Sequence, residues 1–153
     1  MSLVSCVGGK VTWYGRQSDL EDQVGQIGEQ INFYTSQITD IGNRISQNDY
    51  AITEIASQRT NVQLGANFGA NPEEKKLKPD EREHTFNFLT VILQHFYKVK
   101  MILDNEKRTM QAFEKQLQNK KMQVDTQLKI AQQMAPAFEK MEDNAIKRFA
   151  PKV

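Results

Sequence analysis

Apolar residues recur every three or four positions along most of this chain, and this spacing is the strongest constraint on its fold. The first run extends from Leu20 to Val62, and after a break rich in glycine and proline a second extends from Leu89 to Ala145. We call these heptad positions the apolar seam. They are Leu20, Val24, Ile27, Ile31, Tyr34, Ile38, Ile41, Ile45, Asn48, Ile52, Ile55, Arg59 and Val62 in the first run, and Leu89, Ile92, Phe96, Val99, Leu103, Glu106, Met110, Phe113, Leu117, Lys120, Val124, Gln127, Ala131, Met134, Phe138, Met141 and Ala145 in the second. Two apolar positions per seven residues are what helices need to wrap around one another. The sequence therefore predicts an all-α protein, a long antiparallel helical hairpin or coiled coil that completes a bundle by oligomerisation.

Local start signals place the first helix after a short head. Residues 1–17 contain three glycines and a Val-Thr-Trp-Tyr run, so we predict a flexible N-terminal arm that is extended or forms a short strand. Ser18 and Glu21 then have the spacing of a capping box, in which each side chain satisfies a free backbone N–H group. Together with Gly65 as a C-terminal stop, this predicts the first helix over residues 18–64.

The second helix follows a connection rich in glycine and proline over residues 65–79. Pro79 is suited to the first turn of a helix, so we predict the second helix over residues 80–150. Pro136 lies inside this range, where it removes a backbone donor and disfavours helical geometry at Ala135. We therefore expect a kink or break near Pro136.

Folding the two predicted helices back on one another leaves part of the second without a partner. Leu20 then faces Val124, and the chain beyond Val124 extends past the start of the first helix. This overhang carries further large apolar side chains, namely Leu128, Ile130, Met134, Phe138, Met141 and Ile146. Full burial of one such side chain contributes ~1.5–3 kcal/mol, so we expect a cover for them. The alternatives are the N-terminal arm, a segment folded back after Pro136, or another subunit.

Two further patterns point beyond a two-helix structure. Residues 86–103 are apolar on nearly every helical face, which is typical of a helix with several neighbours. The first helix also carries small residues at multiples of seven positions, which are either a solvated face or a close subunit contact. The interaction residues that we predict are Leu93, Tyr97, Ile102, Leu128, Met134, Phe138, Met141, Gly28 and Gly42.

Composition and motifs argue against several function classes. The chain has 20 basic and 19 acidic residues and a formal charge of +1, so no strong field attracts nucleic acid. No stretch is long and apolar enough for a membrane span. Glu81 and His84 have the spacing of a helical di-iron motif, but no second copy follows, because Ile92 precedes His95 by three residues. We expect no catalytic residues, no metal and no cofactor, and hence no enzyme.

The sequence therefore predicts a non-enzymatic structural or interaction protein. Its expected partner is itself, as a homo-oligomer from dimer to tetramer or higher, in an assembly or filament. The alternative is an adaptor or secretion-chaperone-like module that captures a client helix in its open seam. The sequence shows no signal peptide, which predicts a cytoplasmic protein, with export by a non-classical route as the other option.

Overall fold

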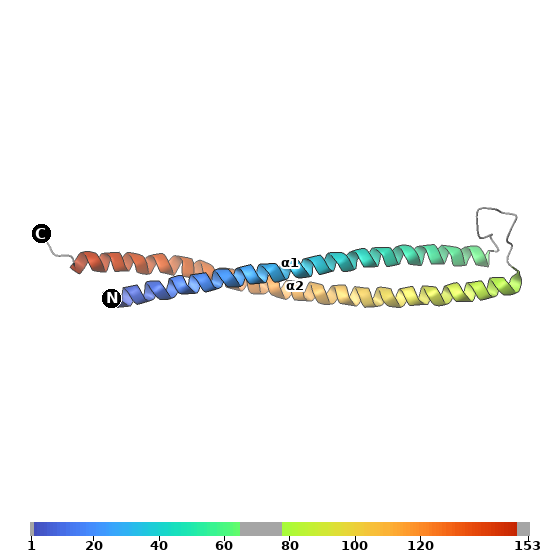
Figure 1. The fold of residues 1–153 in the computed structure, drawn as a ribbon, viewed down its shortest axis with the longest axis horizontal. Helices are drawn as coiled ribbons and strands as arrows, with labels where there is room; N and C mark the ends of the chain where they lie inside the picture. Colours follow the sequence, from blue (N-terminus) through green and yellow to red (C-terminus); the bar gives the residue numbers. More distant parts are fainter. Residues whose placement is uncertain (1, 65–77, 150–153) are drawn as a thin grey trace. The chain divides into compact units, whose positions relative to one another are not determined.

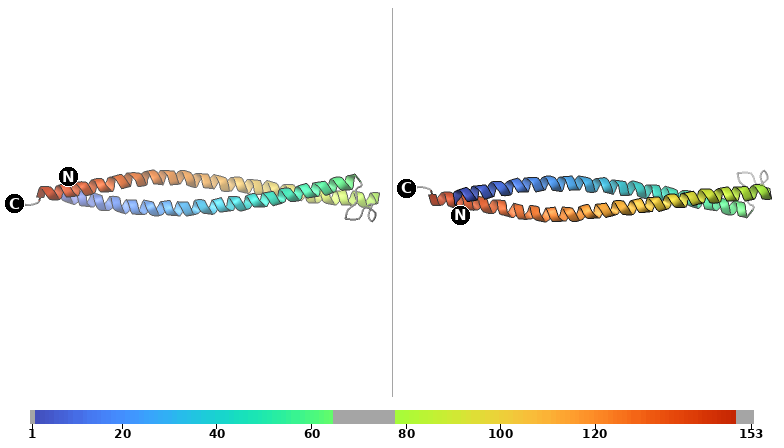
Figure 2. Two further views of the ribbon diagram at one scale, coloured as in Figure 1. Left: turned by 90° about the horizontal axis from the view of Figure 1, so that it is seen from above. Right: turned by 90° about the horizontal axis from the view of Figure 1, so that it is seen from below.

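The computed structural model describes residues 2–64 and 78–149, and these form two helices. Helix α1 spans Leu3–Gln63 and helix α2 spans Pro79–Phe149. The helices lie side by side and run in opposite directions (Figure 1), and two further views agree (Figure 2). The described ranges contain no strand. The prediction of an all-α antiparallel helical hairpin is confirmed.

Contacts between α1 and α2 divide the chain into two units. Unit 1 comprises Met1–Thr35 and Ala112–Val153, and unit 2 comprises Ser36–Gln111. The core of unit 1 consists of Leu20 and Ile27 from α1 with Val124 and Ala131 from α2. In unit 2 the buried apolar side chains are Ile41, Ile52 and Val62 from α1 and Leu89, Leu93 and Leu103 from α2. All of these except Leu93 occupy seam positions, so the heptad pattern accounts for the core of both units.

The first turns of α1 correct the prediction of an N-terminal arm. Residues 3–17 are helical and continue without interruption through the predicted capping box at Ser18. The physical reason is a heptad that extends upstream: Cys6, Trp13 and Leu20 are seven residues apart. Cys6 and Leu20 are buried, and Trp13 packs against the core of unit 1. Burial of these side chains outweighs a local capping signal of about 1 kcal/mol.

These additional helical turns cover much of the predicted overhang on α2. Phe138 lies against the backbone of Gly9, and Ala135 is fully buried. The Tyr14 hydroxyl donates a hydrogen bond of 2.6 Å to the Glu139 carboxylate. The first of the three proposed covers is therefore the one observed, as a helix rather than as an extended arm. The overhang alone no longer requires a second subunit.

Helix α2 excludes one of the two alternatives predicted at Pro136 and begins close to its predicted start. The helix continues through Pro136, so a break is absent there, whereas the kink stays a prediction. Burial of Ala135 on one side and packing of Phe138 on the other hold the chain helical, which offsets the cost of a missing backbone hydrogen bond. Pro79 is the first helical residue, one residue before the predicted start, and the Glu81 carboxylate accepts a hydrogen bond of 3.4 Å from the backbone N–H of Lys78. The rest of the predicted connection, residues 65–77, lies outside the described residues.

A single polar residue is buried in the seam of unit 2. Asn48 is 7% exposed, and its side-chain amide donates a hydrogen bond of 3.0 Å to the backbone carbonyl of Phe96. The amide is satisfied only where the two helices stand in this register, because a shift along the axis would leave it buried without a partner. Asn48 therefore fixes the alignment of α1 and α2 in unit 2.

Candidate interaction surfaces

The structure places the apolar residues that we predicted for interaction in different environments. Leu93 is buried at 4% exposure, Leu128 packs against the core of unit 1, and Met134 and Phe138 are half-buried. The side chains that remain exposed are Met141 at 43%, Tyr97 at 49% and Ile102 at 64%. The first group stabilises the hairpin itself, so only the second group is available to a partner.

The stripe of small residues on α1 faces α2 of the same chain where its contacts are defined. The stripe comprises Gly28, Thr35, Gly42 and Ala56. The Thr35 hydroxyl donates a hydrogen bond of 3.3 Å to Glu114, and Asp49, which interrupts the stripe, forms an ion pair of 2.8 Å with Lys100. Gly28 and Gly42 are half-buried members of the same stripe, and a Cβ atom added at either would meet nothing within 4 Å. The two glycines are therefore not required by close packing within the hairpin.

A stripe of exposed side chains follows one flank of α2 in unit 2. It consists of Phe88, Val91, His95, Lys98 and Ile102, which are three or four residues apart and therefore share a helical face. All five are exposed, and the three apolar members are more than 60% exposed. We call this set the α2 stripe. Tyr97 and Met101 add two further exposed apolar side chains to the same part of α2.

Sequence reasoning named Ile102 from the α2 stripe but not Phe88 or Val91 as interaction residues. The missing information is the side of α2 on which α1 lies. Position 93 follows the seam position Leu89 by four residues and is buried, whereas position 88 precedes it by one and is exposed. A heptad pattern treats these two flanks alike. The apolar character of both flanks was the available signal, and it did not show which one α1 covers.

A second exposed apolar stripe lies at the beginning of α1 in unit 1. Val4, Val7, Val11 and Tyr14 are spaced as one helical face, and each is exposed. The sequence reasoning missed this surface because it assigned residues 1–17 to an arm. In a helix, the spacing of the valines by three and four residues is the signal that identifies the face.

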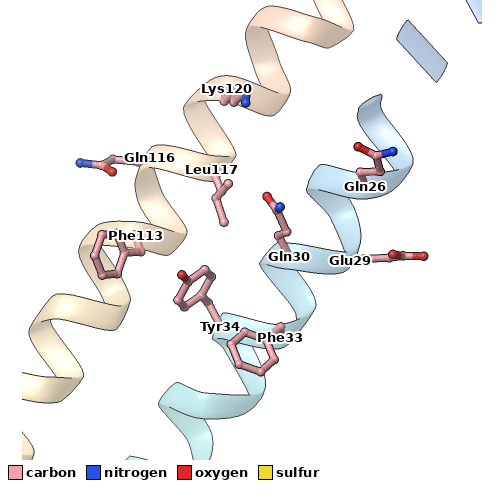
Figure 3. Close-up of a pocket in the computed structure, with 9 residues that line it drawn as sticks. All are labelled: Gln26, Glu29, Gln30, Phe33, Tyr34, Phe113, Gln116, Leu117 and Lys120. Carbon is pink, nitrogen blue, oxygen red and sulfur yellow. The ribbon is translucent and has the colours of Figure 1, made fainter. Parts of the chain in front are cut away.

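A groove of about 670 Å³ opens between the two helices of unit 1. Tyr34 from α1 and Leu117 from α2 point toward the space between the helices, whereas Glu29 points away (Figure 3). Tyr34 stacks on Phe113 with ring centroids 5.7 Å apart and also contacts Phe33 edge-on. The remaining lining residues are Gln26, Gln30, Gln116 and Lys120. The groove therefore has an aromatic end and otherwise a mostly polar rim.

Electrostatic contacts join the beginning of α1 to the end of α2. Lys10 forms an ion pair with Glu142, and this carboxylate raises the pKa of the lysine ammonium. The hydrogen bond to Glu139, assisted by desolvation, raises the pKa of the Tyr14 phenol. The Lys10–Glu142 pair is half-buried and the Tyr14 side chain is exposed, so solvent still screens these contacts, and they orient the helices more than they stabilise them.

Neither a cluster of metal ligands nor a membrane-spanning segment is found among the described residues. In residues 2–64 and 78–149, no three side chains among His, Cys, Asp and Glu converge as metal ligands. Neither α1 nor α2, as far as the structure describes them, has a stretch long and apolar enough to cross a membrane. No known protein family, curated protein sequence or solved structure matches the chain. The exposed helical faces are therefore the features from which a function can be argued.

Proposed function

We propose that this chain is a non-enzymatic structural protein that self-associates through exposed faces of its helices and acts as a subunit of a larger assembly. The observation that carries the proposal is the concentration of exposed large apolar side chains on α2 between residues 88 and 102. Five such side chains, Phe88, Val91, Tyr97, Met101 and Ile102, lie within fifteen residues, and each is 49–66% exposed.

This concentration differs from the single exposed apolar residues that occur on most protein surfaces. Soluble monomers rarely expose contiguous apolar patches larger than roughly a few hundred Å², and larger patches commonly mark sites of interaction. On a helix that already packs on one face, further apolar faces indicate additional helical neighbours. Full burial of each side chain contributes ~1.5–3 kcal/mol, so a second helix over this region would stabilise the protein substantially.

The direct test is the mass of the protein in solution. We expect light scattering coupled to size-exclusion chromatography to show a particle mass that rises with concentration from the monomer value of 17.6 kDa. Negative-stain images of each peak would separate discrete oligomers from filaments. A monomer at every concentration up to the millimolar range would contradict the proposal.

The groove of unit 1 favours a second candidate function, an adaptor that captures a client helix. Its aromatic end, formed by Phe33, Tyr34 and Phe113, offers a site for one or two apolar side chains of an incoming helix. The polar rim would meet the solvated edge of that helix. The volume of about 670 Å³ is sufficient for such side chains.

The two candidate functions respond differently to changes in the groove. An adaptor should lose client binding when Phe33→Ser removes the exposed ring, while the mass of the free protein stays unchanged. The matched variant Tyr50→Ser removes another exposed aromatic of α1, outside the groove, and should leave client binding intact. If Phe33→Ser had no effect on any client recovered by crosslinking, the adaptor function would lose its structural support.

A further inference from the structure

The α2 stripe has an internal symmetry that suggests how a second copy would bind. Phe88 and Ile102 lie seven residues before and seven residues after His95, and both expose large apolar side chains. We infer that α2 of a second copy packs antiparallel on the α2 stripe, with the two His95 residues at a two-fold axis. This inference rests on the proposed self-association and adds its surface, orientation and register.

The antiparallel arrangement brings apolar side chains together on both sides of the axis. Phe88 of one copy meets Ile102 of the other, and the same contact recurs by symmetry. The next layer inward joins Val91, which is exposed, to Val99 of the second copy, which is half-buried in its own hairpin. A parallel arrangement would instead place each residue against itself and would bring Lys98 directly against Lys98 of the second copy.

Charged and polar groups of the stripe fit the same register. Lys98 lies three residues from the axis, so its aliphatic stem can pack while its ammonium group extends to water at the edge. Beyond the two ends of the stripe, exposed His84 meets Glu106 of the second copy, which is half-buried in its own hairpin, and this gives a donor and an acceptor at each end. The two His95 side chains can form a hydrogen bond with each other only if both lie near the two-fold axis. His95 would therefore fix the register of the two α2 helices, as a buried polar residue does in a coiled coil.

The other flank of α2 is largely covered by α1 of the same chain, which leaves Tyr97 exposed there. Leu93 is buried there and Lys100 pairs with Asp49 of α1. Within unit 2 a second helix can therefore reach the α2 stripe without displacing the seam. Helix α2 has apolar residues at both seam positions of each heptad and also on one flank. This pattern is typical of helices that pack on more than one neighbour in a bundle, and it supports a second helix rather than a small molecule as the occupant.

Disulfide trapping tests the orientation directly. In a Cys6→Ala background, which removes the one native cysteine, we expect His95→Cys to form a covalent dimer on mild oxidation. Phe88→Cys alone should not, because in the antiparallel dimer the two thiols lie fourteen residues, about 21 Å, apart. The double variant Phe88→Cys with Ile102→Cys should crosslink again. Met101→Cys, equally exposed but outside the stripe, is the matched control and should stay uncrosslinked.

A charge-pair experiment tests the same register without oxidation. Phe88→Glu should weaken dimerisation roughly a hundredfold or more, because a symmetric dimer carries the change twice. Adding Ile102→Lys to Phe88→Glu should restore much of the affinity, since each new carboxylate then faces a new ammonium group. In a parallel dimer the double variant would place like charges together and dissociate further. Far-UV circular dichroism should show unchanged helicity, because both positions are exposed in the hairpin.

The outcomes separate this inference from the proposed function. If the unmodified protein is monomeric at all concentrations, both are overturned. A second outcome is that the protein self-associates while Phe88→Glu leaves its mass unchanged and His95→Cys crosslinks no better than Met101→Cys. That result overturns only the inference that the α2 stripe is the contact surface. Efficient crosslinking by Phe88→Cys alone would reject the antiparallel orientation and leave a contact on the same face.

Discussion

Two neighbouring glycines in the first turns of α1 offer a sharp test of the structure. A Cβ atom added at Gly9 would lie 2.9 Å from Cγ of Phe138 and closer still to two other ring carbons, whereas one added at Gly8 would meet nothing within 4 Å. Both residues are helical, so both should gain equally from the higher helix propensity of alanine. The two substitutions therefore differ only in the contact with α2.

The expected magnitudes follow from that difference. Gly8→Ala should stabilise the protein by about 0.5–1 kcal/mol, because alanine loses less backbone entropy than glycine on folding. Gly9→Ala has the same gain, but overpacking costs ~1–3 kcal/mol, since the clash involves the base of the Phe138 ring as well as its edge. We therefore expect Gly9→Ala to be less stable than Gly8→Ala by about 1–3 kcal/mol.

The assay is urea unfolding followed by circular dichroism at one protein concentration, since self-association would shift the midpoint. A double-mutant cycle supplies the control: in a Phe138→Ala background the ring is gone, and Gly9→Ala should then stabilise as Gly8→Ala does. Equal effects of the two glycine substitutions in the unmodified background would refute the reasoning. That result would mean that residues 3–17 do not pack on α2 and that the overhang is open.

Three further outcomes follow from contacts within the hairpin. Asn48→Asp should destabilise the protein by about 2 kcal/mol or more in chemical unfolding, because a buried carboxylate would face the Phe96 carbonyl, whereas Asn48→Leu should be nearly neutral but loosen the register. Pro136→Ala should raise the unfolding midpoint, by up to about 3 kcal/mol in unfolding free energy, because it restores a backbone hydrogen bond inside α2. An unchanged midpoint would mean that the helix is interrupted at this position. The hydrogen bond from Tyr14 to Glu139 raises the phenol pKa above its ordinary value near 10. The contribution of this bond to folding stability is therefore complete below about pH 10 and is lost as the pH rises through the folded-state pKa. The difference in unfolding free energy between the unmodified protein and Tyr14→Phe should shrink above about pH 10.

The hairpin could be predicted from the sequence because its determinant is a long-range periodicity repeated many times. Local signals were less reliable where they competed with that periodicity. The glycines at positions 8 and 9 suggested an arm, yet Gly9 provides space for Phe138, and the heptad of Cys6, Trp13 and Leu20 continues the helix. The serine capping signal failed for the same reason, because burial of several side chains exceeds the free energy of one cap.

The interaction surfaces were less accessible to prediction than the fold. A heptad repeat identifies a buried seam, but the apolar flank of α2 contains both Leu93, which α1 covers, and Phe88, which it leaves exposed. The choice depends on the rotation of each helix about its axis, which small differences in packing determine. The groove of unit 1 similarly depends on two aromatic seam residues, Tyr34 and Phe113, meeting in one layer.

The contact between the first turns of α1 and the last turns of α2 also has a consequence for biosynthesis. The hydrogen bond from Tyr14 to Glu139 joins residues 125 positions apart, whereas that from Asn48 to Phe96 joins residues 48 apart. Closing the longer loop directly costs about 0.8 kcal/mol more entropy, and a ribosome makes Glu139 only after Asn48 and Phe96. The two helices should therefore pair first near Asn48, and the pairing should then extend toward Tyr14 and Glu139. Until the residues around Glu139 have been synthesised, Cys6 and Trp13 remain without their packing partners on α2, and we expect a chaperone that binds exposed apolar segments to bind the nascent chain there.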